Sequence, residues 1–229
     1  MPQQDPEELK RSYPVVHYHG PKKPFTVTIE RLRPSEWVSL SDISQKVVKA
    51  ILISEDWAFY SHNGFDFEQI KEAVETNVER GKFVRGASTI TQQVAKNVFL
   101  DQQKSLVRKL KEASITMQLE EHLSKSRILE IYLNIVEWGE GIFGIHDAAQ
   151  FYFKKDPSQL NAKEGAFLAM LLPSPKKYSQ SFRDKKLTEF AAKRVRTILG
   201  KLVAAKVLTE EQEQTELRMP LSFEIQAKP

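Results

Sequence analysis

The chain has 229 residues, a formal net charge of +4 and no cysteine, and 41% of its residues are hydrophobic. This length and hydrophobic content suit one globular domain, with room for a small additional lobe. The absence of cysteine excludes disulfides and thiolate metal sites. The small positive charge fits a phosphate ligand or a membrane surface better than it fits nucleic acid, for which no motif is present.

Residues 1–40 differ in composition from the rest of the chain because they are rich in proline and contain short alternating runs such as Phe25–Ile29. This pattern predicts an extended N-terminal arm with one or two strands, followed by a single domain over 41–229. His17 and His19 would share one strand face. Without a third ligand nearby, an exposed strand is a better interpretation than a metal site.

The first residues, Met1–Pro6, contain no secretory signal, and no run of the chain approaches the roughly 18 apolar residues of a membrane span. We expect the natural protein to carry an anchor upstream of this start.

From Ser41 onward the hydrophobic spacing is helical. Apolar residues from Ile43 to Ile51 predict a helix that ends near Glu55. Capping patterns at Asp66 and Thr89 predict helices through about Glu79 and about Val98. Further helices are expected over 104–123, with apolar positions at 107, 110, 113 and 117, and over 125–135, 146–153, 162–172 and 186–206, with a short last helix after Thr209. Glycines 139, 141 and 144 predict a loop. The fold class is therefore mainly α.

The segment Ser54–Asp66 contains the adjacent carboxylates Glu55 and Asp56, several aromatic residues, His62 and a turn glycine between two helices. Carboxylates are costly to bury without partners, whereas aromatic residues favour burial. Their combination on one connector predicts a half-buried cleft.

The segment Gly86–Asn97 leads into a helix whose first turn is rich in hydroxyl groups. Free N–H groups and the helix dipole favour an anion there, and Lys96 could add a charge. A solvated polar face on an ordinary capped helix remains the alternative. Arg108, Lys109 and Glu112 lie one turn apart on another helix, where a surface salt bridge is the simpler interpretation of these residues alone.

Four segments resemble, in order, motifs of the peptidoglycan glycosyltransferases. Glu55–Asp66 resembles E-D-x-x-F-x-x-H-x-G-x-D, Gly86–Asn97 resembles G-x-S-T-I-T-Q-Q-x-x-K-N, Arg108–Glu112 resembles R-K-x-x-E, and Lys125–Asn134 resembles K-x-x-I-L-E-x-Y-L-N. The resemblance spans about 40–205, and 135–144 looks most like the monofunctional branch of Gram-negative bacteria. A transpeptidase activity is not expected because the chain contains no K-T-G.

The resemblance implies a two-lobed, lysozyme-like head with a smaller membrane-facing jaw. It implies an inverting enzyme that polymerises lipid II into β-1,4 glycan strands and releases polyprenyl pyrophosphate, at the periplasmic face of the inner membrane. The implied partners are lipid II, the nascent glycan chain, the membrane surface and other cell-wall synthesis proteins, with no nucleic acid. No cofactor is required by a motif, although Mg²⁺ or Mn²⁺ bound with the donor pyrophosphate is compatible with the chemistry.

The same resemblance gives the expected site residues. Glu55 would be the general base, since an aromatic, helix-terminal environment raises the pKa of a carboxyl group. Glu112 would act indirectly by orienting Arg108 or Lys109, and Glu130 and Asn134 would support the cleft. The remaining candidates bind substrate, at the leaving group or in the sugar subsites: Asp56, Phe59, His62, Ser88, Thr89, Gln92, Gln93, Lys96, Asn97, Arg108 and Lys109.

Two alternatives stay open: a lytic muramidase, which also uses carboxylates, and a non-catalytic lipid- or glycan-binding module. The basic residues around Glu112 argue against the first, and the presence of both Glu55 and Glu112 argues against the second. The loop Gly81–Ala87 is expected to be mobile and to act as a lid. The apolar residues Phe83, Val84, Phe99, Leu100 and Leu106 are expected to contact the membrane, unless they belong to the core.

Overall fold

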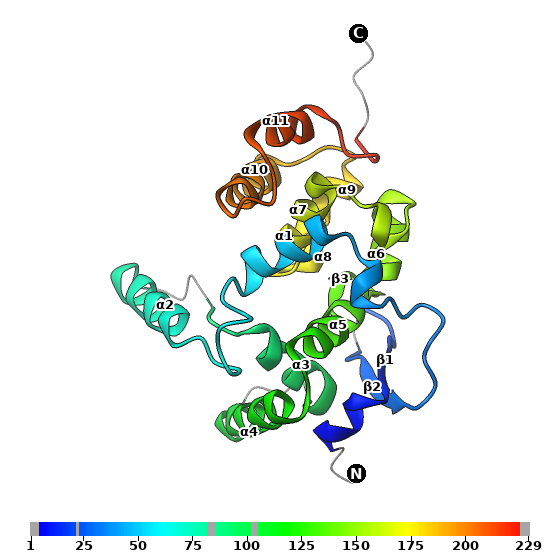
Figure 1. The fold of residues 1–229 in the computed structure, drawn as a ribbon, viewed down its shortest axis with the longest axis vertical. Coiled ribbons are helices and arrows are strands. Elements are labelled where there is room, and N and C mark those ends of the chain that lie inside the picture. Colours follow the sequence, from blue (N-terminus) through cyan, green and yellow to red (C-terminus); the bar gives the residue numbers. More distant parts are fainter. Residues whose placement is uncertain (1–4, 22, 82–85, 102–104, 225–229) are drawn as a thin grey trace.

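The computed structural model describes residues 5–21, 23–81, 86–101 and 105–224. Within these ranges the protein is mainly helical, so the predicted fold class is confirmed (Figure 1). The longer helices are α1 (Gln45–Glu55), α2 (Phe67–Glu79), α3 (Ile90–Phe99), α4 (Leu106–His122), α5 (Lys125–Ile135), α6 (Ile145–Phe153), α7 (Ala162–Leu171), α10 (Glu189–Ala204) and α11 (Glu210–Arg218). The shorter elements are the helices α8 (Pro175–Tyr178) and α9 (Gln180–Arg183), the 3-10 turns η1 (Pro6–Lys10), η2 (Leu40–Asp42) and η3 (Pro157–Gln159), and the strands β1 (Tyr13–His17), β2 (Thr26–Glu30), β3 (Glu137–Gly139) and β4 (Ile142–Phe143).

The centre of the core is α7, of which every residue is buried. Helices α1 and α10 pack against it. Gly165 allows α1 to come close, because a Cβ atom at this position would lie 2.8 Å from the Cα atom of Val47. This packing fixes the direction of α1 and therefore the position of its last residue, Glu55.

A second group of helices forms the lower part of the molecule in Figure 1, where α3 packs against both α4 and α5. Helix α2 stands to one side of this group (Figure 1). Of the residues of α2, all of which the structure describes, Ala73 alone is buried. The loop that we expected to be a mobile lid, Gly81–Ala87, lies largely outside the described residues, since 82–85 are not among them.

The N-terminal arm packs on the helical body. Leu9 in η1 is fully buried, and η1 contacts α4. Arg127 of α5 donates hydrogen bonds to the carbonyl oxygens of Leu9 and Ser12, at 3.0 and 2.7 Å. The strands β1 and β2 form an antiparallel pair in which Val15 faces Thr28. The described part of residues 1–40, for which one or two strands were predicted, thus contains two.

The histidines of the arm bind neighbouring hydroxyl groups. The Nε2 atom of His17 lies 2.8 Å from the Oγ1 atom of Thr28, and His19 has the same relation to Thr26. His17 is the last residue of β1, and His19 lies two residues beyond it. Both histidines therefore contact residues of the partner strand β2.

Glu130 and Asn134, which were expected to support the cleft, form hydrogen bonds with the end of the arm. The Glu130 carboxylate accepts hydrogen bonds from the Trp37 indole and from the backbone N–H of Leu40, both at 3.0 Å. The Asn134 side chain accepts a hydrogen bond from the backbone N–H of Val38 at 2.8 Å and donates one to the carbonyl oxygen of Val38 at 2.9 Å. Four partly buried polar groups are satisfied in this way, so the segment before α1 is tied to α5.

Two expectations differ from the structure. The glycine-rich loop after α5 contains a small hairpin of β3 and β4, in which Gly141 is required because a Cβ atom there would lie 2.7 Å from the Tyr18 ring. The apolar stripe expected on α4 points outward: Val107, Leu110 and Met117 are all exposed. The buried residues of α4 are Glu112, Thr116 and Leu119, so the side facing α3 is largely polar.

Candidate active site

Glu55 is the last residue of α1 and is held by α3. Its Oε2 atom accepts a hydrogen bond from the Nε2 atom of Gln93 at 3.1 Å. Burial raises the pKa of Glu55, and the nearby Asp56 adds to this effect, while the Gln93 hydrogen bond and the positive charge of Arg194 oppose it. The net change is upward, which is the direction a general base at near-neutral pH requires.

Tyr132 of α5 sets the orientation of the Gln93 amide. The Tyr132 hydroxyl donates to the Oε1 atom of Gln93 at 3.4 Å, so the amide nitrogen is turned toward Glu55. Tyr132 is fully buried, and burial together with the charges of Glu55 and Asp56 raises its pKa well above the ordinary value. The hydroxyl therefore stays protonated and remains a donor over the working pH range.

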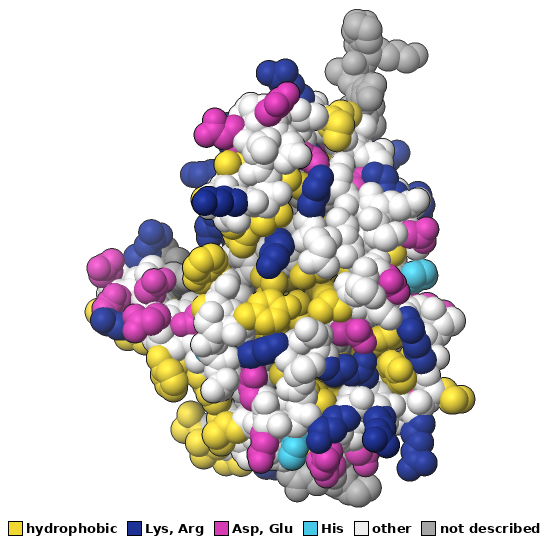
Figure 2. All heavy atoms as spheres, in the orientation of Figure 1, with side chains coloured by type: hydrophobic (Ala, Val, Ile, Leu, Met, Phe, Trp, Pro, Cys, Tyr) yellow, Lys and Arg dark blue, Asp and Glu magenta, His cyan; other side chains and the backbone are white. Residues whose placement is uncertain are grey.

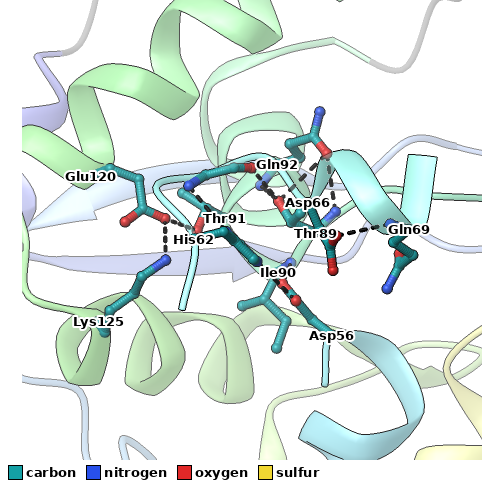
Figure 3. A network of polar contacts seen from close by, with 11 residues as sticks. Asp56, His62, Asp66, Gln69, Thr89, Ile90, Thr91, Gln92, Glu120 and Lys125 are labelled. Atoms are coloured by element: carbon teal, nitrogen blue, oxygen red, sulfur yellow. Dashed lines mark hydrogen bonds and ion pairs between the residues drawn. The ribbon is translucent and has the colours of Figure 1, made fainter. Parts of the chain in front are cut away.

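Asp56 is fully buried and binds two different elements (Figure 3). Its Oδ1 atom lies 2.9 Å from the Nε2 atom of His62, and its Oδ2 atom accepts the backbone N–H of Ile90 at 2.9 Å. The Nδ1 atom of His62 accepts the backbone N–H of Gly64 at 3.1 Å, so the hydrogen-bond pattern places the ring proton on Nε2. His62 thus closes the loop after α1, and Asp56 joins that loop to α3.

The first turn of α3 was expected to offer free N–H groups to an anionic ligand, but two of these groups already have partners within the protein. The N–H of Ile90 is taken by Asp56, and the N–H of Gln92 is taken by the Thr89 hydroxyl at 3.2 Å. The Gln92 side chain in turn accepts the Thr89 N–H at 3.0 Å, which completes the predicted capping box. The anion at this helix end is the carboxylate of Asp56 itself.

Thr89, Gln92 and Phe59 are buried, as is Asp56, and their burial conflicts with the expectation that they contact substrate. The Thr89 hydroxyl donates to the carbonyl oxygen of Gly64 at 2.7 Å. Phe59 lies in the core, where the ammonium group of Lys125 sits 4.5 Å from the centre of its ring. These side chains fix the walls of the site from behind, because little or none of their surface faces solvent.

Lys125 also belongs to a network that joins three helices (Figure 3). It forms an ion pair with Glu120 of α4 at 2.8 Å. The same Glu120 oxygen accepts the hydroxyl of Thr91 in α3 at 2.5 Å. Because the partners come from α3, α4 and the start of α5, this network keeps the three helices in one arrangement.

Glu112 forms a second cluster on α4 with two cations. Its side chain is buried and accepts from the Nη1 atom of Arg108 at 3.3 Å, and its other oxygen contacts the ammonium of Lys109. The Nε atom of Arg108 is buried and has no hydrogen-bond partner among the residues that the structure describes. Glu112 therefore holds both cations, while part of the Arg108 guanidinium is left for another acceptor.

The remaining candidates lie on α3 or just before it. Ser88 and Lys96 are exposed, and Asn97 is partly exposed, so all three offer surface to a ligand. The structure thus brings Glu55, Gln93 and Arg194 together on one side. Arg108, Lys109 and Glu112 lie on α4, which packs against the same helix α3.

Sequence reasoning missed three residues of this region. Tyr132 was part of a recognised motif but was not proposed for the site, and Arg194 lies in the predicted helix 186–206, to which no role was given. Trp57 is 75% exposed directly after the two carboxylates. An aromatic residue that stays exposed beside a carboxylate pair is a signal of a binding surface, although only the structure shows that it is exposed.

A resident metal does not fit these residues. Within the described ranges, no group of three histidine, aspartate or glutamate side chains lies together as metal ligands would. Both oxygens of Glu112 already contact cations. We therefore derive no step that depends on a protein-bound metal.

Comparison with known proteins identifies the family. The transglycosylase family model matches residues 23–203. A biosynthetic peptidoglycan transglycosylase from Nitrosospira multiformis is 42% identical over 76% of this chain and 74% of its own length. One from Aromatoleum aromaticum is 45% identical over 75% of this chain and 73% of its own length. One from Azoarcus is 48% identical over 66% of this chain and 65% of its own length. The expected relationship is confirmed, and the chain belongs to the transglycosylase family.

Proposed function

We propose that this chain is a peptidoglycan glycosyltransferase that polymerises lipid II into β-1,4-linked glycan strands. The family match and the names of the relatives support this activity. The structural observation that carries the proposal is Glu55, a carboxylate with a raised pKa at the end of α1, held by Gln93.

The reaction is a single displacement at the anomeric carbon of the donor sugar. The 4-hydroxyl group of the acceptor is a poor nucleophile, so Glu55 removes its proton as the new C–O bond forms. The bond between the anomeric carbon and the lipid pyrophosphate breaks on the opposite face, which inverts the configuration. The Gln93 amide keeps one Glu55 oxygen in place, and the second oxygen is available to the acceptor.

The leaving pyrophosphate needs positive charge, because it gains a further negative charge as it departs. Since Asp56 occupies the N-terminus of α3, side-chain cations must supply that charge. We assign Arg108, Lys109 and Lys96 to this task. Glu112 is a positioning residue that orients Arg108 and Lys109 and does not itself meet the pyrophosphate.

We also propose that the faces of α2 and α4 rest on the membrane that holds the lipid carrier. Exposed apolar residues on these helices include Phe67, Val78, Leu106 and Leu110, and Figure 2 shows hydrophobic side chains gathered over α4. A soluble protein seldom leaves such residues unpartnered on two helices. Within the described ranges, we find no helix with the length and hydropathy that a bilayer crossing requires.

The test is a polymerisation assay with purified lipid II in detergent, run in parallel with purified glycan strands. Polymer is expected from lipid II. Cleavage of the strands would indicate a muramidase instead, and binding without any product would indicate a non-catalytic module. Glu55→Gln should lower turnover by about 10²-fold or more, because the substitution keeps size and removes basicity. The matched control is Glu211→Gln, at an exposed position of α11, which should retain activity.

A further inference from the structure

A pocket of about 600 Å³ opens beside α8, α9 and the start of α10, and none of its lining residues belongs to the proposed reaction centre. This volume lies in the range of ligand-binding pockets. The lining contains two cations, two aromatic rings, an amide and a hydroxyl, but no carboxylate: Lys177, Tyr178, Gln180, Arg183, Thr188 and Phe190.

The aromatic rings form a flat, partly open wall. The centres of the Tyr178 and Phe190 rings are 4.8 Å apart, with 31° between their planes. Phe190 is 47% exposed although it belongs to a helix that packs on the core. The ammonium of Lys177 lies 5.9 Å from the centre of the Tyr178 ring. An apolar surface with a cation at its edge favours a ligand that has both an apolar part and a negative charge.

The guanidinium of Arg183 is held rigidly by neutral acceptors. Its Nη1 atom donates to the Ser179 hydroxyl at 2.7 Å, and its Nη2 atom donates to the Gln180 side chain at 2.8 Å and to the carbonyl oxygen of Lys176 at 3.3 Å. In the described part of the chain, no carboxylate lies within ion-pair distance of Arg183 or Lys177. Two positive charges therefore face the pocket, one of them in a fixed orientation, and neither forms an ion pair among the described residues. The carboxylate of Asp184 lies behind Gln180, whose amide it accepts at 2.6 Å.

Helix α10 places this pocket next to the reaction centre. Phe190 and Arg194 are four residues apart on α10 and are therefore neighbours on its surface. Helix α10 also packs against α1, the helix that ends at Glu55, and the positive charge of Arg194 acts on that carboxylate. Phe190, which lines the pocket, is thus about one helical turn from Arg194, roughly 5.4 Å along the axis of α10.

We propose that this pocket binds a carboxylate-bearing stem peptide of the glycan substrate, an inference that rests on the proposed function. The peptide part of peptidoglycan is attached to the glycan, so the sugar that the proposed function places at Glu55 would bring a carboxylate-bearing peptide with it. A sugar bound at Glu55 would bring such a peptide near Arg194 and then to Lys177 and Arg183. Charge complementarity and distance along α10 both favour this occupant over an uncharged glycan.

The experiment measures binding of a soluble muramyl pentapeptide by titration calorimetry, next to the same peptide with its carboxylates amidated. The acidic peptide should bind the unmodified chain, and Lys177→Gln and Phe190→Ala should each weaken this binding by about tenfold, as expected for loss of one charge-assisted or aromatic contact. Both side chains are exposed, so neither variant should unfold the protein. Lys201→Gln, at an exposed position in the last turn of α10, is the matched control and should bind normally.

The proposal is overturned if amidation does not change the affinity, or if both pocket variants bind like the control. It is also overturned if vesicles of anionic phospholipid bind in a manner that depends on Lys177 while the peptide does not, since the surface would then be a membrane contact. Polymer formation from lipid II is measured separately. A chain that binds the peptide as expected but makes no polymer would leave the pocket in place and refute the proposed polymerase, and the reverse pattern would refute the pocket alone.

Discussion

The Asp56 carboxylate accepts the backbone N–H of Ile90 at 2.9 Å and so occupies the N-terminus of α3. Asp56 directly follows Glu55, and Ile90 lies three residues before Gln93. One buried hydrogen bond therefore connects the residue after the proposed base with the helix that holds the base. The geometry of Glu55 depends on a contact that is not part of the reaction itself.

Asp56→Asn should destabilise the fold. Asp56 accepts from His62 on one oxygen and from Ile90 on the other, and an asparagine offers a nitrogen donor in one of these two places. A donor would then face a donor, with a cost of about 1–3 kcal/mol for a buried group that loses its partner. Urea unfolding measures this loss, and the exposed Asp101→Asn is the control. Equal unfolding midpoints for the two variants would contradict the role we give to Asp56.

Glu55→Gln should stabilise the protein in a manner that depends on pH. Burial raises the pKa of Glu55 above its ordinary value of 4.5. A carboxyl group with a raised pKa in the folded state contributes its full stability below pH 4.5 and loses it as pH rises through the folded-state pKa. Glutamine cannot ionise, so the Glu55→Gln variant is not destabilised as the pH rises. Its free energy of unfolding should therefore exceed that of the unmodified chain at pH 8.

The same comparison below pH 4.5 should show little difference, because Glu55 is then protonated in both states. Glu211→Gln serves as the control at both pH values, since Glu211 is exposed. A Glu55→Gln effect of the same size at both pH values would mean that burial of the charge is not its cause.

The sequence predicted the helix boundaries well where side chains cap helix ends. The capping residues Asp66 and Thr89 both accept the backbone N–H three residues later, as their spacing indicates. These predictions succeed because capping is local: the donor, the acceptor and the turn lie within four residues. The glycine-rich loop was less predictable, since its hairpin is stabilised by contacts with the distant arm.

The candidate site shows the same division between local and distant effects. Glu55, Gln93 and Glu112 could be proposed from motifs, but the burial of Asp56 and Phe59 could not, because it results from packing against α3 and α5. The outward direction of the α4 stripe was also unpredictable. Hydrophobic periodicity indicates that a helix has an apolar side, but does not indicate whether that side meets the core or a membrane.

Replacing both Leu106 and Leu110 by serine should reduce membrane binding without loss of stability. These residues are 87% and 73% exposed, so the folded protein loses little packing. Phe99, by contrast, packs against the core, and its replacement would confuse binding with stability. Co-sedimentation with anionic vesicles at high salt measures the apolar part of the binding, because salt screens the electrostatic part.

The control for the leucine pair is Leu32→Ser, at a position that is 82% exposed in the N-terminal arm. It should bind vesicles as the unmodified chain does. If all variants sediment alike at high salt, the exposed face of α4 does not rest on the membrane.

Tyr132→Phe should shift the pH dependence of polymerisation. The substitution removes the hydroxyl that orients Gln93 and keeps the buried ring. Because the Gln93 hydrogen bond lowers the pKa of Glu55, a loosely held amide allows that pKa to rise. The acidic limb of the kcat profile should therefore move to higher pH, since the base must be ionised to act. Gln93→Leu should move it in the same direction and further.

The double variant separates an indirect effect from two independent ones. If Tyr132 acts only through Gln93, the pH shift in Tyr132→Phe with Gln93→Leu should equal that of Gln93→Leu alone, because the hydroxyl then has no amide to orient. Additive shifts would mean that Tyr132 influences Glu55 by another route. Thermal unfolding of each variant provides the control, since a purely structural defect would lower stability and kcat while leaving the position of the acidic limb unchanged.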